Sequence, residues 1–294
     1  MPPSGDGNVA PLSFRSLPSH RLFAETIPDA LFHYTTLEGA HGILTSKQIW
    51  LTKIQHLNDA AELRYALDLF RIRAQNWPGD LPHETRNFLL ETARQLGSFL
   101  NANICLASFC TEGDLLSQWR AYSAAANGVS LAFSGAFLRQ LSQHEYFHIW
   151  KCLYRSDQHD RVIDDLIGLL LDLYLSGREP PEVLMHQFSI VFLQVAPVLK
   201  HPSFHEEKEW RIISAPVPAG NEHYHVLLAG SRLRPTYQLR FPLDRNGSCR
   251  VVVGACTGPS TDTALMVDAL SLLAGLHGHI GLQVRPSGIP YRAV

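Results

Sequence analysis

Residues 30–54 read ALFHYTTLEGAHGILTSKQIWLTKI, and the spacing of their apolar side chains changes twice along the stretch. ALFHYTT is rich in aromatic and β-branched residues and has the composition of a short strand. The next segment places Leu37, Ala40 and Ile43 on one face of a helix, and QIWLTKI (48–54) returns to a strand pattern. The order strand, helix, strand predicts a fold that mixes both kinds of element.

The same two patterns continue along the chain. Further strands are predicted at 103–110, 129–134, 148–154, 209–213, 236–241 and 250–255, and helices at 59–75, 82–100 and 260–277. Asn58 precedes the first of these helices and suits its N-cap. Between the two groups of strands, residues 157–199 predict two helices parted by GREPP. We therefore expect an α+β protein with a helical insertion at about 157–199.

The composition is typical of a folded globular protein. Of the 294 residues, 46% are hydrophobic and 18% are charged, which is enough apolar material for a sizeable core. We expect one domain over 25–294, preceded by a flexible N-terminal tail at 1–24 that is rich in Pro, Ser and Gly. Lysine and arginine total 25 against 27 aspartates and glutamates, so no overall charge attracts the chain to nucleic acid or to an anionic membrane.

Two further features bear on the compartment. The most apolar later segment, 166–175, is too short to span a bilayer and contains Asp172, so no membrane partner is predicted. The five cysteines are an odd number without a CxxC pair, which argues against a disulfide framework and against a cysteine zinc site. These features favour a cytoplasmic protein.

Several familiar motifs are absent from the sequence. Neither GxGxxG nor GxxxxGK[ST] occurs, so neither a Rossmann site nor a P-loop is indicated. His201 and His205 have the spacing of paired ligands, but Pro202 disfavours the helix that such a pair needs, and no metal site is predicted. GVSLA (128–132) resembles the GxSxG elbow of a hydrolase, but a strand is predicted there, so we interpret Ser130 as an ordinary strand residue.

The segment SFHEEKEWRII (203–213) sets carboxylates directly against an apolar strand. In a strand, Glu207 and Glu209 would share one face, while Trp210 and Ile212 would share the other, a pattern typical of a strand between a cleft and a core. Neighbouring carboxylates raise each other's pKa unless a cation or a hydroxyl donor satisfies them. On spacing alone, a solvated acidic turn before an edge strand explains the segment equally well.

Three ring side chains present a similar choice between packing and function. His33 lies between apolar neighbours, where a histidine is more often a hydrogen-bonded core residue. Trp119 and Tyr122 are three residues apart, the spacing of a helix face, which favours core packing. The same two rings could instead form the floor of a pocket for a flat heterocycle.

Several segments taken together resemble one bacterial family. LFHYTTLEGAHGIL, LNDAAEL, SFCTEGDLLSQWRAYS, KHPSFHEEKEWRII and the terminal SGIPYR are similar to the uncharacterised family called domain of unknown function 2971 (DUF2971). The resemblance keeps the motif order and runs from about residue 30 to the end of the chain. The family name implies no activity.

A second resemblance does imply an activity. His33, followed by a helix and a second strand, resembles the H-[YG]-[TS] opening of ADP-ribosyltransferase-like folds, and Glu207-Lys208-Glu209 is similar to their E-x-E pair. The resemblance implies a split β-sheet core that grips NAD, as a substrate, in a cleft between two small sheets. It also implies cleavage of NAD and transfer of ADP-ribose to a macromolecular acceptor, protein or nucleic acid, or to water, as a toxin or defence effector would do.

Carried over by position, this resemblance gives each residue of the two motifs a role. His33 would anchor a ribose hydroxyl, with Tyr34 and Thr35 at its flanks. Glu209 would be the catalytic carboxylate that stabilises the oxocarbenium charge, and Glu207 would help to orient the acceptor.

The aromatic ring that stacks on nicotinamide in that superfamily would come from Trp119 or Tyr122. Both lie in a helix-like segment, whereas the superfamily carries its aromatic on a strand, so the sequence departs from the pattern here.

A different class of function stays open at this point. The same cleft could belong to a non-catalytic module that binds a nucleotide or a partner. Five arginines late in the chain could contact phosphate or could be scattered surface charges: Arg232, Arg234, Arg240, Arg245 and Arg250.

Overall fold

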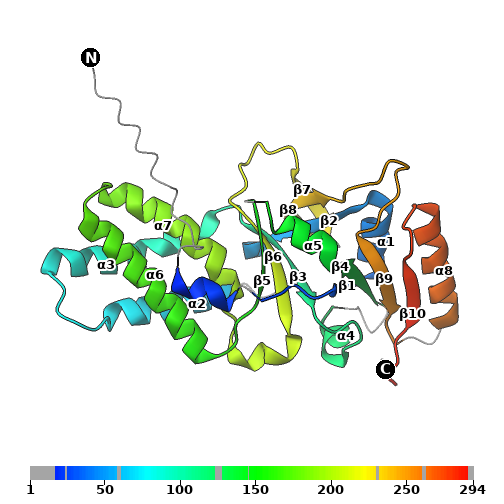
Figure 1. Ribbon diagram of the computed structural model, residues 1–294, viewed down its shortest axis with the longest axis horizontal. Helices are drawn as coiled ribbons and strands as arrows, with labels where there is room; N and C mark the ends of the chain where they lie inside the picture. The colour runs from blue at the N-terminus through cyan, green and yellow to red at the C-terminus, as the bar shows by residue number, and fades with distance from the viewer. Residues whose placement is uncertain are drawn as a thin grey trace, which may run out of the picture.

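The computed structural model describes residues 17–23, 25–57, 61–122, 128–144, 146–229, 232–259 and 263–290. Helices gather at one end of the molecule and the larger part of a β-sheet at the other (Figure 1). Of the predicted tail at 1–24, residues 17–23 are described, and Leu17 and Phe23 are buried in the helical core. Part of the expected tail is therefore packed, ahead of the expected boundary at residue 25. Asn58, the predicted N-cap, lies outside the described residues.

The predicted strands form, with shifts at their ends, and two further strands join them, at residues 224–229 and 283–286. The strands are β1 (Ala30–Thr36), β2 (Gln48–Lys53), β3 (Cys105–Cys110), β4 (Gly128–Ser134), β5 (Phe147–Lys151), β6 (Glu209–Ser214), β7 (Tyr224–Ala229), β8 (Arg232–Arg240), β9 (Val252–Thr257) and β10 (Gln283–Pro286). They lie in the order β10-β9-β4-β1-β3-β2-β8-β7, while β6 pairs with both β3 and β5. All of these pairs are antiparallel except β9 with β10. This mixed, largely antiparallel sheet with helices confirms the α+β class.

The sheet divides at β3. One edge of β3 pairs with β6 along Leu106–Cys110. On its other edge, β1 pairs at Cys110 and β2 pairs at Cys105 and Leu106. From there β1 continues along β4 and β2 continues along β8, so the two strands move apart over the middle of β3. The result is a fork between β1 and β2, which are joined by helix α1 (Leu37–Ser46).

The turn that closes this fork is specified by local chemistry. The side chain of Thr36 caps α1 by accepting a hydrogen bond from the backbone N–H of Gly39 at 3.2 Å. Lys47 ends the helix in the left-handed region with φ 52°, and β2 begins at the next residue. The predicted strand, helix and strand at 30–54 are therefore confirmed.

The remaining helices are α2 (Ala61–Gln75), α3 (His83–Gln95), α4 (Leu116–Tyr122), α5 (Gly135–Leu141), α6 (Ser156–Ser176), α7 (Pro181–Val195) and α8 (Thr263–Leu276). The two helices predicted at 157–199 are α6 and α7, and they pack with α2 and α3 around one apolar cluster (Figure 1). Phe70 of α2 contacts Phe188 and Phe192 of α7, with ring centroids 5.6 and 5.5 Å apart. The helical part of the fold is thus built from two stretches that are separated in the sequence.

The structure also shows that the helical part is not isolated from the sheet. Trp150 of β5, Leu106 of β3 and Ile213 of β6 belong to the same buried cluster as the helices. The other side of the sheet packs into a second cluster, which includes Trp210 and Ile212. The apolar face predicted for the 209–213 strand is therefore confirmed.

Candidate functional site

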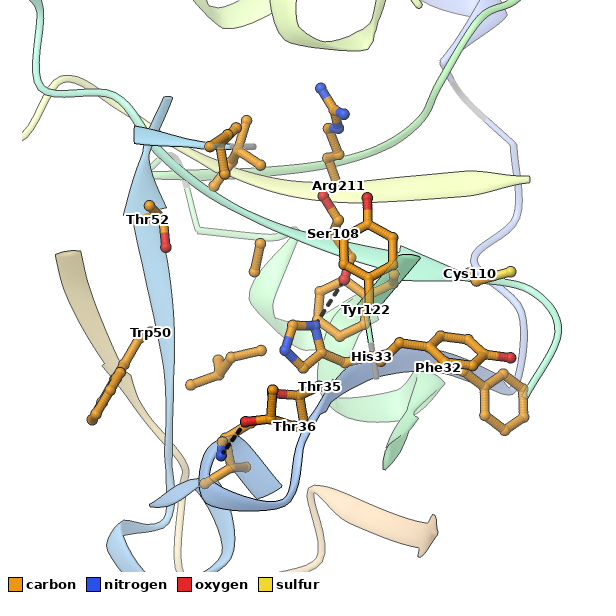
Figure 2. A pocket seen from close by; sticks show the side chains of 18 of the residues that line it. Phe32, His33, Thr35, Thr36, Trp50, Thr52, Ser108, Cys110, Tyr122 and Arg211 are labelled. Atoms are coloured by element: carbon orange, nitrogen blue, oxygen red, sulfur yellow. Dashed lines mark hydrogen bonds between the residues drawn. The ribbon is translucent and has the colours of Figure 1, made fainter. Parts of the chain in front are cut away.

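A cavity of about 500 Å³ opens in the fork between β1 and β2. The middle of β3 lies behind it, and residues of α1, α4, β6, β7 and β8 complete its walls (Figure 2). This volume lies within the range typical of small-molecule sites. Of the predicted site residues, six line the cavity: His33, Tyr34, Thr35, Tyr122, Glu207 and Glu209. Trp119 does not line it.

His33 lies at the centre of the fork. Its Nδ1 donates a hydrogen bond to the backbone oxygen of Ser108 at 2.9 Å, which is drawn as a dashed line in Figure 2. Because a carbonyl oxygen can only accept, the neutral ring carries its proton on Nδ1 and leaves Nε2 as an acceptor. Burial lowers the pKa of His33, and the bond to Ser108 offsets part of this effect, so the ring is neutral at pH 7.

Tyr34 and Trp119 belong to a small packed cluster at the outer side of the fork. The Tyr34 hydroxyl donates to the backbone oxygen of Glu112 at 2.8 Å and accepts from the backbone N–H of Leu115 at 2.9 Å. Trp119 is fully buried, packs edge-on against Tyr34 and donates its Nε1–H to Asp114 at 2.7 Å. These contacts hold α4 against β1. Trp119 is therefore a packed core residue, as its helix-face spacing favoured.

Tyr122, one turn further along α4, differs from Trp119. Its ring reaches the cavity on the same side as His33 and Arg211 (Figure 2). Burial raises the pKa of Tyr122 to about 12, and the negative charges of Glu209 and Glu207 act in the same direction. The hydroxyl therefore stays protonated at neutral pH and can donate a hydrogen bond beside the acidic pair.

Thr35 owes its position to a glycine of the following helix. A Cβ atom placed on Gly39 would lie 2.1 Å from the Thr35 Oγ1, closer than any real contact. Any larger residue at position 39 would therefore move the Thr35 side chain or the start of α1. A glycine three residues after the end of the strand is the sequence signal for this close approach.

The acidic pair is held differently from the strand pattern that we predicted. Glu209 begins β6, but Glu207 ends a 3₁₀ turn (Pro202–Glu207), and Lys208 between them has φ 44°. The expectation of two carboxylates on one strand face is therefore wrong, because the chain reverses at Lys208. The two side chains meet instead at Lys200, whose Nζ lies 2.5 Å from an oxygen of each.

Arg211 completes the ionic cluster. Its guanidinium holds Glu209 through two contacts, 2.7 Å from Nε to Oε1 and 3.0 Å from Nη2 to Oε2, and also donates to the backbone oxygen of Pro197. Arg211 lies two residues after Glu209 in β6, which puts both side chains on one face, so the spacing of the two residues could have predicted this contact.

The charge state of Glu209 follows from these partners. Burial alone would raise the pKa of Glu209, but the charges of Arg211 and Lys200 and the hydrogen bonds from both outweigh it and lower the pKa to about 2. The backbone N–H of Glu209 also donates to the Tyr154 hydroxyl at 2.9 Å. Glu209 is therefore an ionised carboxylate in a fixed orientation.

No local pattern in the sequence points to Lys200. It follows α7 and the short 3₁₀ turn at Ala196–Val198, and its backbone N–H donates to the oxygen of Leu153 at 3.0 Å. This contact with the segment after β5 aims the ammonium group at the acidic pair. Only 4% of the Lys200 side chain is exposed.

The described part of the chain gives little support to a metal site or to a serine nucleophile. No group of three or more His, Cys, Asp or Glu among the described residues could hold a metal ion. His201 accepts from the backbone N–H of Ser203 and His205 donates to the oxygen of Pro202, so both serve the local turn. Ser130 is buried in β4, as predicted. None of the described helices has the length and apolar character needed to cross a membrane.

The comparison with protein families concerns the part of the chain that carries this ionic cluster. Residues 118–212 match the family described as "Protein of unknown function (DUF2971)". The matched range supports the resemblance to DUF2971 and contains Tyr122, Lys200, Glu207 and Glu209, while His33 lies outside it. Neither a curated protein nor a solved structure gives a match to the chain.

Proposed function

We propose that the protein is an ADP-ribosyltransferase-like enzyme that cleaves NAD and transfers ADP-ribose to a macromolecular acceptor or to water. One observation carries this proposal: a single cavity is lined by His33, Tyr122, Glu207 and Glu209, which come from three distant parts of the sequence. Their chemistry matches the requirements of the reaction. The cavity also lies in the fork of one connected sheet, whereas the resemblance implied a cleft between two small sheets; an opening between strands supports the proposal in either arrangement.

In the proposed reaction, the bond between the ribose C1′ and the nicotinamide nitrogen breaks, and nicotinamide leaves with the electron pair. Positive charge then develops on the ribose ring, and a nearby fixed carboxylate stabilises it, as in glycoside hydrolysis. A hydroxyl, amine or water attacks C1′ and loses a proton. Removing one preorganised partner of this kind typically lowers a rate by about 10² to 10³.

The properties of the lining residues support specific roles. The neutral ring of His33 offers Nε2 as an acceptor for a ribose hydroxyl, because Nδ1 is engaged with Ser108. Tyr122 offers a ring for a flat heterocycle and replaces Trp119 in that role, since Trp119 is buried away from the cavity.

The two carboxylates suit different roles in the reaction. Glu209 is ionised and rigid, which suits electrostatic stabilisation of the ribose cation. Glu207 is more accessible, with 20% of its side chain exposed against 6% for Glu209, which suits contact with the acceptor. We therefore assign stabilisation to Glu209 and acceptor orientation to Glu207.

The test is release of nicotinamide from NAD by the purified protein. We expect wild type to release nicotinamide, Glu209→Gln to lose at least about 100-fold in rate, and the exposed neighbour Glu206→Gln to behave as wild type. Because Glu209→Gln removes a charge from a buried cluster, its fold is checked by circular dichroism, and His33→Ala serves as a second variant outside that cluster. If wild type neither binds NAD nor releases nicotinamide, with or without a cell extract as acceptor, the proposal fails.

The ionic cluster also favours a second candidate, a non-catalytic module that binds a nucleotide. Both oxygens of Glu209 are engaged by Arg211 and one also by Lys200, so its charge is largely neutralised by neighbours, as in a structural anchor. Saturable binding of NAD by calorimetry without any nicotinamide release would favour this candidate over the enzyme.

A further inference from the structure

The β7–β8 hairpin ends the sheet and carries apolar side chains that the core does not cover. β7 is the last strand in the sheet order of the described residues. Tyr224 packs against the core at the start of the hairpin. Beyond it on the same face, Val226, Leu228 and Leu233 are 59%, 70% and 65% exposed.

Within the described part of the chain, no strand pairs with the outer edge of β7. The backbone N–H of Gln238 donates to the oxygen of His223, and this pair continues the β7–β8 register, so alternate residues of β7 bond to β8. His225 and Leu227 therefore point their backbone groups toward β8. Val226 and Leu228 point theirs outward, and within the described residues neither has a hydrogen-bond partner there.

Natural sheets usually protect such an edge with charged residues, proline, a bulge or a very short strand. The opposite edge follows this rule, because β10 is four residues long and contains Arg285 and Pro286. β7 has six residues, YHVLLA, with no lysine, arginine, carboxylate or proline. Its exposed apolar edge is therefore well suited to pairing with another strand.

We propose that β7 pairs antiparallel with β7 of a second copy of this chain, forming a two-fold symmetric dimer with a continuous sheet. A two-fold register centred on Leu227 joins the outward-facing groups. It sets Val226 of each copy opposite Leu228 of the other, and Leu227 opposite its own symmetry mate. The facing side chains are then apolar, and no like charges meet across the pair.

The self-complementary composition is the reason to favour a second copy over a foreign strand. A strand without charges offers nothing that would select a charged partner, and its apolar side chains suit one another. Leu227 also lines the cavity, so the dimer contact borders the candidate site in both copies. One short strand pair buries less than the roughly 1,200 Å² of a standard interface, so we expect a dimer that dissociates in the micromolar range.

The test is sedimentation of the full chain from about 1 to about 500 µM. We expect wild type to pass from monomer to dimer, while Val226→Pro, which removes an outward N–H and leaves the β7–β8 bonds intact, stays monomeric. Leu272→Lys on α8 replaces a leucine that is 62% exposed, far along the sheet order from β7, and should dimerise as wild type does. A wild-type monomer at every concentration, or a dimer lost in Leu272→Lys and kept in Val226→Pro, overturns the proposal.

Two further measurements, a charge-pair rescue and amide exchange in wild type, test the interface even if Val226→Pro fails to fold. Val226→Lys and Leu228→Glu should each weaken dimerisation by at least about tenfold, and an equimolar mixture should restore it through the facing Lys–Glu pair. In wild type, amide exchange at Val226 and Leu228 should slow as the concentration rises, while exchange at Leu227, already bonded to β8, should not change. Absence of both effects in a chain that does dimerise would place the interface elsewhere.

Discussion

Replacing Lys200 by Met tests how the acidic pair is held together. The Lys200 ammonium lies 2.5 Å from Glu207 and 2.5 Å from Glu209 and is almost fully buried. At an effective dielectric constant of about 20, one pair at this distance attracts by roughly 7 kcal/mol. The cost of removing the charges from water offsets part of this attraction, so breaking a buried pair typically lowers the free energy of unfolding by about 3 to 5 kcal/mol. We expect a loss of that size at pH 7.

The pH dependence of this loss gives a second, independent signature. The pKa of Glu209 is lowered from 4.5 to about 2, so the stability that it contributes is present above pH 4.5 and disappears as the pH falls toward 2. In Lys200→Met, the folded-state pKa of Glu209 should rise because one of its two cations is gone. The difference in stability between wild type and variant should therefore be largest at neutral pH and shrink below pH 4.5.

The measurement is urea unfolding at pH 7 and at steps down to about pH 3.5, followed by circular dichroism. Lys208→Met is the matched control, because Lys208 pairs with Glu112 at 3.1 Å while both side chains are about half exposed. Removing that surface pair should lower the free energy of unfolding by less than about 1 kcal/mol. Equal losses of stability in the two lysine variants, or a loss in Lys200→Met that is independent of pH, would show that Lys200 does not hold the acidic pair in this way.

Three other outcomes follow from the geometry. Gly39→Ala should destabilise the fold by about 1 to 3 kcal/mol in urea unfolding because it displaces Thr35, whereas Gly42→Ala, with open space around it, should not. The lowered pKa of His33 means that its contribution to stability is present above pH 6.5 and declines as the pH falls below it, and His33→Asn should abolish this dependence between pH 7 and about 5. Trp119→Leu should lower stability by about 2 to 4 kcal/mol and leave NAD binding by calorimetry unchanged, with the larger effect on binding expected from Tyr122→Leu.

The elements of the fold were largely predictable from the sequence because each buries one face against a core. The strand, helix and strand at 30–54 and the two helices at 157–199 all appear in the structure. β7 was missed, since its exposed apolar residues do not alternate with polar ones as in a half-buried strand. The fork could not be predicted, because β1 and β2 each leave β3 to follow a different partner.

The candidate site was predictable where a signal was local. His33 and Glu209 were singled out because the short motifs around them, HYT and EKE, resemble known ones, and both line the cavity. The spacing of Trp119 and Tyr122 could not separate a packed ring from a lining ring, because both lie on the inner side of a short helix against β1. Only the tertiary structure shows that the Trp119 ring is fully buried and that the Tyr122 ring lines the cavity.

What the sequence by itself determined is most of the strands and helices and the apolar face of most of them, because residues that face one core recur at a regular spacing along the chain. What only the tertiary structure decided is which of these segments become neighbours. Lys200 meets Glu207 and Glu209 through a 3₁₀ turn and a reversal at Lys208, and the Ser108 carbonyl is satisfied by an imidazole from another strand. Such contacts depend on pairings between distant strands of similar composition, and the packing of the whole chain selects among them.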